Sequence, residues 1–319
     1  MNQITGQTNS SLGLAIIWAE SLSEASCIHA RLEAVCLKIG DKILFWQGIY
    51  AGSGFAFGKD VVVAVDAQSR RDQVDLMLEL LQLYGQDPKN TRYLINTHND
   101  FDHIGGNAEF LEKIPKIKIV AGMEDATKIE NPLNELGETG FMAERVVENL
   151  RTCKVEIKID KDISLEMGDL RLDIIRTPGH TPGSICVYHA DSRSLFTGDT
   201  VLGYGRWAGP KGIPLIRADS LQPMLDSLKK ISRLDVKWLL PGHGKAVFNG
   251  AERIQETIAA LEDLPKQVLG TLRETHTMFE VSDKLLIYPA TIETAIKMLE
   301  KEGKVKKTKW DEDRWLAAG

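Results

Sequence analysis

Short apolar runs and longer amphipathic stretches alternate along most of the chain. Residues 61–65 form a β-branched apolar run that is typical of a buried strand, and residues 93–95 form another. Residues 72–84, which lie between these runs, carry apolar side chains at helical spacing. We therefore predict a β-α-β unit in this part of the chain, which is the building block of an α/β protein.

The alternation of helices and strands continues to about residue 248. Helices are predicted at residues 108–113 and 133–151, and a further helix begins at Ser220 and runs to about residue 231. Residues 155–176 predict strands joined by a turn at Gly168. These elements extend one large α/β domain.

The pattern changes after residue 248. Residues 251–276 predict one long helix, and residues 291–301 predict a second helix with Thr291 as its N-cap. Residues 303–315 predict two short strands around an acidic turn. We expect two domains, residues 1–248 and residues 249–319.

Composition and charge narrow the class of protein. The chain has 319 residues, of which 43% are hydrophobic and 26% charged, so it can bury a sizeable core. Its net charge of −6 gives no general attraction to nucleic acid or to an anionic membrane surface. We expect a small-molecule substrate and no membrane or nucleic-acid partner. We leave open whether the chain forms a homo-oligomer.

The amino-terminal region and the cysteines indicate the compartment. Residues 12–19 are apolar but too short to span a bilayer, and they lack the preceding basic residues of a signal peptide. They predict a first strand or packing segment. The four cysteines show no Cys-x-x-Cys spacing, so we expect buried thiols in a reducing compartment. The sequence therefore predicts a cytoplasmic protein.

Side chains suited to metal binding follow four predicted strands, at residues 93–95, 172–175, 194–196 and 238–240. Imidazoles mixed with carboxylates suit a borderline dication better than calcium or magnesium, which prefer oxygen ligands. Four of the chain's seven histidines lie in the segments that follow these strands. Glycines in the same loops permit tight turns: Gly179, Gly183, Gly198, Gly242 and Gly244. The candidate metal ligands are His98, Asp100, Asp102, His103, His180, Asp199 and His243.

These residues resemble the pattern of the metallo-β-lactamase superfamily, which reads His-x-His-x-Asp-His, then His, then Asp, then His. The resemblance spans roughly residues 30–248. It implies a four-layer αβ/βα sandwich with a two-metal cleft at the strand ends. By position, the first metal would be held by His98, Asp100 and His180, the second by Asp102, His103 and His243, and Asp199 would bridge them.

Asp100 departs from this pattern, because a histidine is usual at its position. The carboxylate adds one negative charge and a hard oxygen ligand, which favours oxygen-preferring ions. A carboxylate here resembles the flavodiiron branch, which carries Glu at this position and binds iron. We therefore expect two divalent metal ions, with zinc first and iron or manganese as alternatives. A solvated Asp100 that binds no metal is the remaining interpretation.

The resemblance and the ligand set predict a metal-dependent hydrolase. A metal-bound hydroxide would attack a small ester, thioester or lactone, while Asp102 orients the nucleophile and relays a proton as the catalytic residue. A phosphodiester hydrolase (nuclease) is one alternative. An iron-dependent oxidoreductase of the persulfide-dioxygenase or flavodiiron kind is another. A binding protein without catalysis is the third.

Two further regions carry predictions of their own. The loop after Asp199 is rich in glycine and proline, and we predict substrate contacts at Tyr204, Arg206 and Trp207, with ordinary loop packing as the alternative. The carboxy-terminal layout resembles the winged-helix-like module of β-lactamase-like-protein-2 relatives. Its lysines at residues 301–309 are interspersed with acidic residues, so we expect a solvated face rather than a phosphate-contacting stripe.

Overall fold

The structure is a computed structural model that describes residues 36–48, 50–135, 150–205, 217–274, 276–308 and 314–318. Several predictions fall on residues outside these ranges. They are the apolar segment at residues 12–19, most of the helix at residues 133–151, the acidic turn at residues 311–313, and the candidate substrate contacts Arg206 and Trp207.

The first sheet contains the strands that follow one another at the start of the described chain. Its order is sequential, with antiparallel pairs up to β4 and parallel pairs from β4 to β7. In the parallel part Val65 lies beside Ile95, so the loops that follow β4 and β5 leave the same edge. The strands are β1 (Cys36–Ile39), β2 (Ile43–Gln47), β3 (Gly52–Phe57), β4 (Val62–Val65), β5 (Thr91–Ile95), β6 (Lys118–Gly122) and β7 (Val155–Ile159).

The second sheet has five strands in the order β12-β11-β10-β9-β8. Its pairs are antiparallel except for β11 and β12, which run parallel with Gly198 beside Pro241. That register brings the segments after Gly198 and Pro241 together. The turn between β8 and β9 is made at Gly168, whose φ is +68°. The strands are β8 (Ile163–Met167), β9 (Leu170–Arg176), β10 (Ile185–His189), β11 (Ser194–Gly198) and β12 (Trp238–Pro241).

The two sheets pack face to face around a common apolar core. Phe45, Val63 and Ile95 of the first sheet share one buried cluster with Val187 and Phe196 of the second. Apolar side chains are therefore needed on both faces of these strands, which explains the nearly continuous apolar runs in the sequence.

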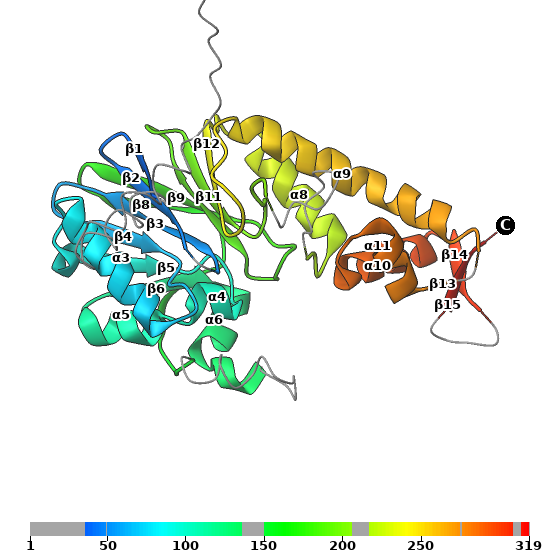
Figure 1. Cartoon of the computed structure of the whole chain (residues 1–319), viewed down its shortest axis with the longest axis horizontal. Coiled ribbons are helices and arrows are strands. Elements are labelled where there is room, and N and C mark those ends of the chain that lie inside the picture. The colour runs from blue at the N-terminus through cyan, green and yellow to red at the C-terminus, as the bar shows by residue number, and fades with distance from the viewer. Residues whose placement is uncertain are drawn as a thin grey trace, which may run out of the picture.

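Helices cover the outer faces of both sheets. Helix α3 (Arg71–Leu83) buries Val74, Met77 and Leu80 against the first sheet, on the side where α5 (Asn107–Lys113) and α6 (Met123–Glu130) also lie. Helices α8 (Leu221–Ile231) and α9 (Gly250–Thr271) pack on the second sheet. Figure 1 shows the helix-sheet-sheet-helix arrangement. The predicted four-layer α/β fold is confirmed.

The carboxy-terminal part packs on the second helical layer rather than standing apart from it. The long helix α9 runs from the sheets to α10 (Met278–Leu285) and α11 (Pro289–Lys301) (Figure 1). A small sheet follows, in the order β13-β15-β14, from β13 (His276–Thr277), β14 (Val305–Lys307) and β15 (Arg314–Ala317). One buried cluster joins Leu228 and Leu239 to Ile292 and Leu299. The boundary at residue 248 and the winged-helix-like assignment stay predictions.

Two predictions about this region were wrong in detail. The predicted long helix ends at Thr271 instead of residue 276, and α10 was not predicted, although Thr277 and Glu280 form the capping box that starts it. Helix α11 begins at Pro289, so Thr291 lies in its first turn rather than at its N-cap. The Thr291 hydroxyl instead accepts a hydrogen bond from the backbone N–H of Ala218, at 2.8 Å.

Shorter elements complete the described chain. A single turn of helix, α4 (Phe101–Ile104), and two 3₁₀ turns, η2 (Pro88–Asn90) and η3 (Pro132–Glu135), connect the longer elements. Among the described residues, no helix combines the length and the apolar character needed to cross a membrane. Cys153 and Cys186 are free thiols.

Candidate metal centre

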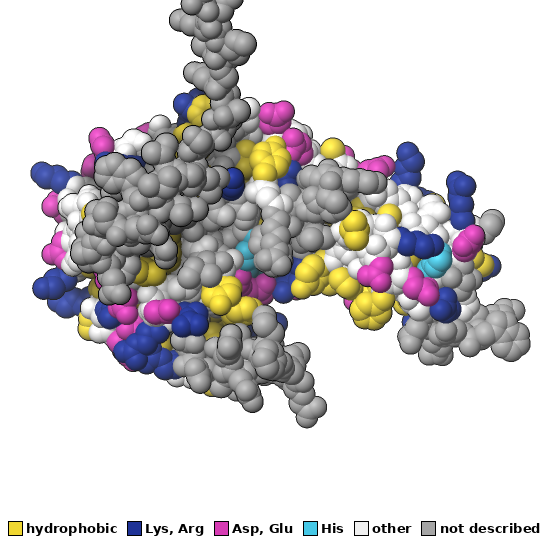
Figure 2. Space-filling view, in the orientation of Figure 1, with side chains coloured by type: hydrophobic (Ala, Val, Ile, Leu, Met, Phe, Trp, Pro, Cys, Tyr) yellow, Lys and Arg dark blue, Asp and Glu magenta, His cyan; other side chains and the backbone are white. Residues whose placement is uncertain are grey.

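All seven candidate ligands come together at one edge of the sandwich. His98 to His103 follow β5, His180 lies between β9 and β10, Asp199 follows β11 and His243 follows β12. Their nitrogen and oxygen atoms form two groups, and within each group the atoms lie within 4.8 Å of one another. Figure 2 shows histidine and acidic side chains at the surface between the sheets and the carboxy-terminal helices. The groups are His98, Asp100, His180 and Asp199, and then Asp102, His103 and His243.

Asp199 lies between the two groups. Its Oδ2 atom is 3.8 Å from Nε2 of His180 and 3.3 Å from Nε2 of His243. Its Oδ1 atom is 3.5 Å from Nε2 of His103. One carboxylate therefore faces imidazoles of both groups, which is the arrangement that a bridging ligand requires.

Asp66, which follows β4, orients two of the imidazoles through their Nδ1 atoms, one directly and one through the Thr97 hydroxyl. Its Oδ2 atom lies 2.8 Å from Nδ1 of His103 and accepts a hydrogen bond from the Thr97 hydroxyl at 2.7 Å. Since that hydroxyl donates to Asp66, it accepts from Nδ1 of His98, at 3.0 Å. No local sequence pattern links Asp66 to Thr97 and His103, which lie 31 and 37 positions away.

Backbone carbonyls orient the other two imidazoles. Nδ1 of His180 lies 2.8 Å from the carbonyl oxygen of Arg217, and Nδ1 of His243 lies 2.9 Å from that of Tyr50. In all four histidines Nδ1 faces an acceptor, so a proton is held there and Nε2 points into the centre. This is how histidine is usually prepared for metal binding.

The donor atoms in the centre fit metal ions. Nε2 of His98, Nε2 of His103 and Oδ1 of Asp199 are buried without a hydrogen-bond partner among the described residues. Buried polar atoms left in this state cost free energy, and they mark sites that an ion would complete. Four imidazoles and three carboxylates are a suitable set for two divalent cations.

The carboxylates dominate the electrostatics of the centre. Burial opposes the charged form of His243, but Asp199 and Asp102 outweigh it and raise its pKa to about 11. Burial likewise opposes the charged form of His103, whose pKa Asp66 and Asp102 raise to about 9. Burial favours the neutral form of Asp199, yet His243 and His103 hold its pKa below the usual range. The protein alone therefore attracts positive charge here.

Gly242 leaves the space in which two ligands meet. A Cβ atom at this position would lie 2.2 Å from Oδ1 of Asp199 and 2.6 Å from Cε1 of His103. Gly198 serves the same centre differently, because its φ of +47° turns the chain toward Asp199. These glycines belong to the tight loops that the sequence predicts around the ligands.

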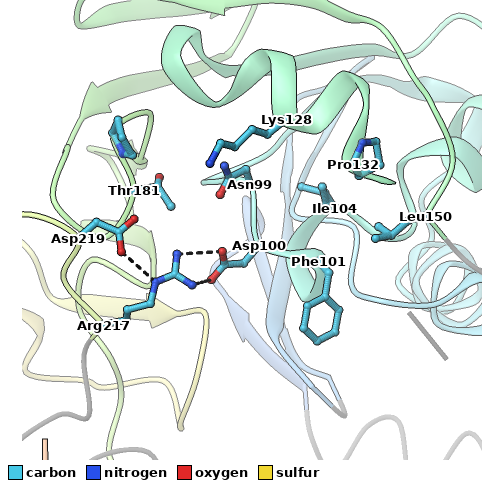
Figure 3. Close-up of a pocket in the computed structure, with 11 residues that line it drawn as sticks. Asn99, Asp100, Phe101, Ile104, Lys128, Pro132, Leu150, Thr181, Arg217 and Asp219 are labelled. Carbon is cyan, nitrogen blue, oxygen red and sulfur yellow. Dashed lines mark hydrogen bonds and ion pairs between the residues drawn. The ribbon is translucent and has the colours of Figure 1, made fainter. Parts of the chain in front are cut away.

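Arg217 contacts Asp100 and had no signal in the sequence. Its Nη1 lies 3.0 Å from Oδ2 of Asp100 and its Nη2 lies 3.1 Å from Oδ1, while its Nε lies 3.3 Å from Oδ1 of Asp219 (Figure 3). The pair forms one wall of a cavity of about 280 Å³ that is also lined by Phe101 and Lys128. Arg217 lies 18 positions after Asp199, the nearest candidate ligand in the sequence, so only the folded chain reveals this contact.

Tyr204 is the one candidate substrate contact among the described residues, and it contacts α9. Its ring lies 4.5 Å from the guanidinium carbon of Arg253, and its hydroxyl donates to Glu256 at 3.0 Å. Its side chain remains 43% exposed. A role for Tyr204 in substrate binding stays a prediction.

Comparison with known proteins identifies the family. The model of a family described as the metallo-beta-lactamase superfamily matches residues 61–243, which include all seven candidate ligands. The chain belongs to the metallo-beta-lactamase superfamily. This result confirms the resemblance predicted from the ligand pattern.

Relatives within the superfamily agree with a hydrolase. The chain is 33% identical over 142 residues to the cytoplasmic isozyme of hydroxyacylglutathione hydrolase from Saccharomyces cerevisiae, covering 40% of this chain and 42% of that protein. It is 23% identical over 241 residues to the Beta-lactamase-like protein 2 homolog of Caenorhabditis elegans, covering 70% of each. The chain thus spans less than half of the yeast relative.

A solved structure gives independent support for the fold. A metallo-beta-lactamase family protein from Thermus thermophilus superposes with a TM-score of 0.66 at 20% identity. The superposition covers 84% of this chain and 94% of that one. The similarity therefore extends past the sandwich into the carboxy-terminal helices.

Proposed function

We propose that this superfamily member is a metal-dependent hydrolase of a small thioester. The observation that carries the proposal is the set of imidazole and carboxylate atoms that converge on one centre, with Nε2 of His98 and His103 unpartnered among the described residues. The choice of a thioester rests on the yeast relative, whose name describes hydrolysis of a hydroxyacyl-glutathione. Oxygen esters and lactones share the reactive carbonyl and belong to the same class of test substrates.

Two divalent ions would occupy the two groups of side chains. His98, Asp100 and His180 would hold the first, Asp102, His103 and His243 the second, and Asp199 would contact both. When bound, such ions increase the acidity of water and polarise a carbonyl group. We propose zinc, with iron or manganese as alternatives because Asp100 adds a hard oxygen ligand.

Asp102 is the residue that we assign to proton transfer. Its Oδ2 atom lies 3.3 Å from Nε2 of His243 and 3.9 Å from Nε2 of His103. Burial opposes its ionisation, but these histidines outweigh burial and lower its pKa, so the carboxylate is ionised at neutral pH. An ionised Asp102 would orient the attacking water, accept its proton at Oδ2 and return that proton to the sulfur as the acyl C–S bond breaks, so that the leaving group departs as a thiol.

The remaining side chains shape the reaction rather than take part in it. Asp66 holds Nδ1 of His103 at 2.8 Å, which keeps the reactive Nε2 lone pair directed at the centre. The cavity beside Asp100 is lined by Phe101 and Ile104 on its apolar side and by Lys128 on its polar side. An acyl group of modest size would be shielded there from bulk water.

A substrate panel with defined metal content tests the proposal. The purified chain would be stripped of metal, reloaded with zinc, iron or manganese, and assayed with an acyl-glutathione, an acyl-coenzyme A, an oxygen ester, a lactone and a phosphodiester. We expect release of free thiol from at least one thioester, abolished by a chelator and restored by metal. Turnover of the phosphodiester alone would overturn the thioester proposal.

The iron-dependent oxidoreductase is the second candidate, and Asp100 is the observation that favours it. Metal analysis of the protein as purified, with a visible absorption spectrum, separates it from a zinc hydrolase. The nuclease alternative has less support, because Lys304 pairs with Glu302 at 2.7 Å and Lys307 lies 5.3 Å from the Trp315 ring centre. Both lysines therefore interact with neighbouring side chains of the carboxy-terminal part.

A further inference from the structure

Asp100 is bound through both carboxylate oxygens by one side chain. The two terminal nitrogens of Arg217 approach Oδ2 at 3.0 Å and Oδ1 at 3.1 Å, in the parallel two-bond geometry that arginine forms with carboxylates (Figure 3). Both side chains are partly buried, with exposed fractions of 24% for Asp100 and 30% for Arg217. The same Oδ2 atom also lies 3.3 Å from Nε2 of His180 and 3.6 Å from Nε2 of His98.

One oxygen of Asp100 is therefore shared between the arginine and the metal-binding imidazoles. Arg217 also has a second link to this group of ligands, because its carbonyl oxygen lies 2.8 Å from Nδ1 of His180. Residue 217 thus fixes two of the four side chains in the first group, one through its side chain and one through its backbone.

The charges of the pair cancel. Asp100 alone would make the first group one unit more negative than a group with a neutral imidazole at this position. With Arg217 the two side chains are neutral together, while an oxygen lone pair still faces His98 and His180. A cation as close as this guanidinium would repel a divalent ion strongly if its carboxylate were removed.

We propose that Asp100 and Arg217 act as one neutral ligand unit, in which Asp100 supplies the oxygen and Arg217 sets its charge and orientation. The inference rests on the proposed metal centre, but not on the identity of the substrate. It has a definite consequence: removing the Asp100 charge alone leaves the Arg217 guanidinium beside the first metal with Asp219, 3.3 Å from its Nε, as its remaining acidic partner. The two positions must therefore change together to preserve binding.

A double-mutant cycle on metal binding tests this unit. Wild type, Asp100→His, Arg217→Met and the double variant would be titrated with zinc against a chelating dye, and the bound ions counted by mass spectrometry. We expect Asp100→His to weaken the first site at least about tenfold, since one partner of a partly buried ion pair is lost. The double variant should recover this loss, because the repelling cation is gone and a third imidazole remains.

Matched variants separate charge from shape. Asp100→His combined with Arg217→Lys keeps the positive charge, so its first site should still bind zinc weakly. Asp100→His combined with Arg217→Met lacks that charge, so its first site should bind zinc more tightly. Arg171→Met removes an exposed arginine that pairs with Glu166 at 3.1 Å, and it should leave metal binding unchanged. Cobalt substitution adds a spectroscopic readout. The visible absorption bands of cobalt in the first site should disappear in Asp100→His and return when Arg217→Met is added.

The results can contradict the inference clearly. Equal zinc affinity in Asp100→His and in the double variant would show that Arg217 does not set the charge of this site. If Asp100→His fails to fold, Asp100→Asn with and without Arg217→Met gives the same comparison with a side chain of unchanged size. Because binding is measured without substrate, a failure of the thioester proposal would leave these measurements intact.

Discussion

The buried guanidinium of Arg253 donates a hydrogen bond from Nε to the backbone carbonyl oxygen of Leu202, at 2.9 Å. Leu202 lies three residues after Asp199, and the next residue, Gly203, donates its N–H to the carbonyl oxygen of His243 at 2.8 Å. Helix α9 is thereby connected to the loops of two candidate ligands. The carboxy-terminal part of the chain supports the metal centre through this contact.

Replacing Arg253 should lower stability substantially. Arg253→Ala removes the bond to Leu202, the ion pair with Glu256 at 2.8 Å and the packing of a side chain that is 1% exposed. We expect a loss of about 2–4 kcal/mol in the free energy of unfolding, measured by urea denaturation. Lys266→Ala on the exposed face of α9 is the control, and it should change stability by less than about 0.5 kcal/mol. Equal effects of the two variants would contradict the assignment.

Replacing Asp102 should remove activity while leaving the fold intact. We expect Asp102→Ala to reduce turnover of the thioester at least about 100-fold, which is the usual scale for a positioned proton-transfer group. Circular dichroism and thermal denaturation serve as the check on folding. Near-normal turnover in this variant would remove Asp102 from the mechanism.

Adding a methyl group at Gly242 should damage metal binding. The Cβ of Gly242→Ala would lie 2.2 Å from Oδ1 of Asp199, so the ligand must move. We expect fewer bound ions per chain by mass spectrometry. Gly270→Ala is a matched control in α9, because a Cβ there meets nothing within 4 Å. That change should keep the metal content and stabilise the helix by up to about 1 kcal/mol. Normal metal content in Gly242→Ala would contradict the close approach.

The metal-free protein should lose stability as pH rises above neutral. Burial opposes protonation of His103 and His243, but the carboxylates raise their pKa values to about 9 and about 11, above the 6.5 of a free histidine. The stabilisation is therefore complete below pH 6.5 and is lost as pH rises through 9 and 11. Thermal denaturation between pH 6.5 and about 10 should show a falling midpoint without metal.

The metal-loaded protein is the comparison for this measurement. Bound ions take the place of the protons on Nε2, so the midpoint should vary much less over the same pH range. A flat profile in the metal-free protein would show that the histidines do not gain protons on folding.

The strands and the cluster of candidate ligands could be predicted because their signals are local. An apolar run followed by His98 or Asp199 contains both the strand and the loop in a few adjacent residues. The contact between Arg217 and Asp100 joins residues 117 positions apart, and nothing near Arg217 in the sequence marks it as a partner of Asp100. Thr291 shows the same limit. It matches an N-cap pattern, but its hydroxyl accepts a hydrogen bond from the backbone N–H of Ala218. Local patterns cannot report such tertiary partners.

The metal centre draws on both sheets. His98 to His103 leave the first sheet after β5, while Asp199 and His243 leave the second after β11 and β12. Ions bound at this edge would hold the two halves of the sandwich together as well as prepare them for catalysis. A cell short of metal would therefore lose more than the activity, since the unliganded chain would open more often and would be more readily cleaved by proteases.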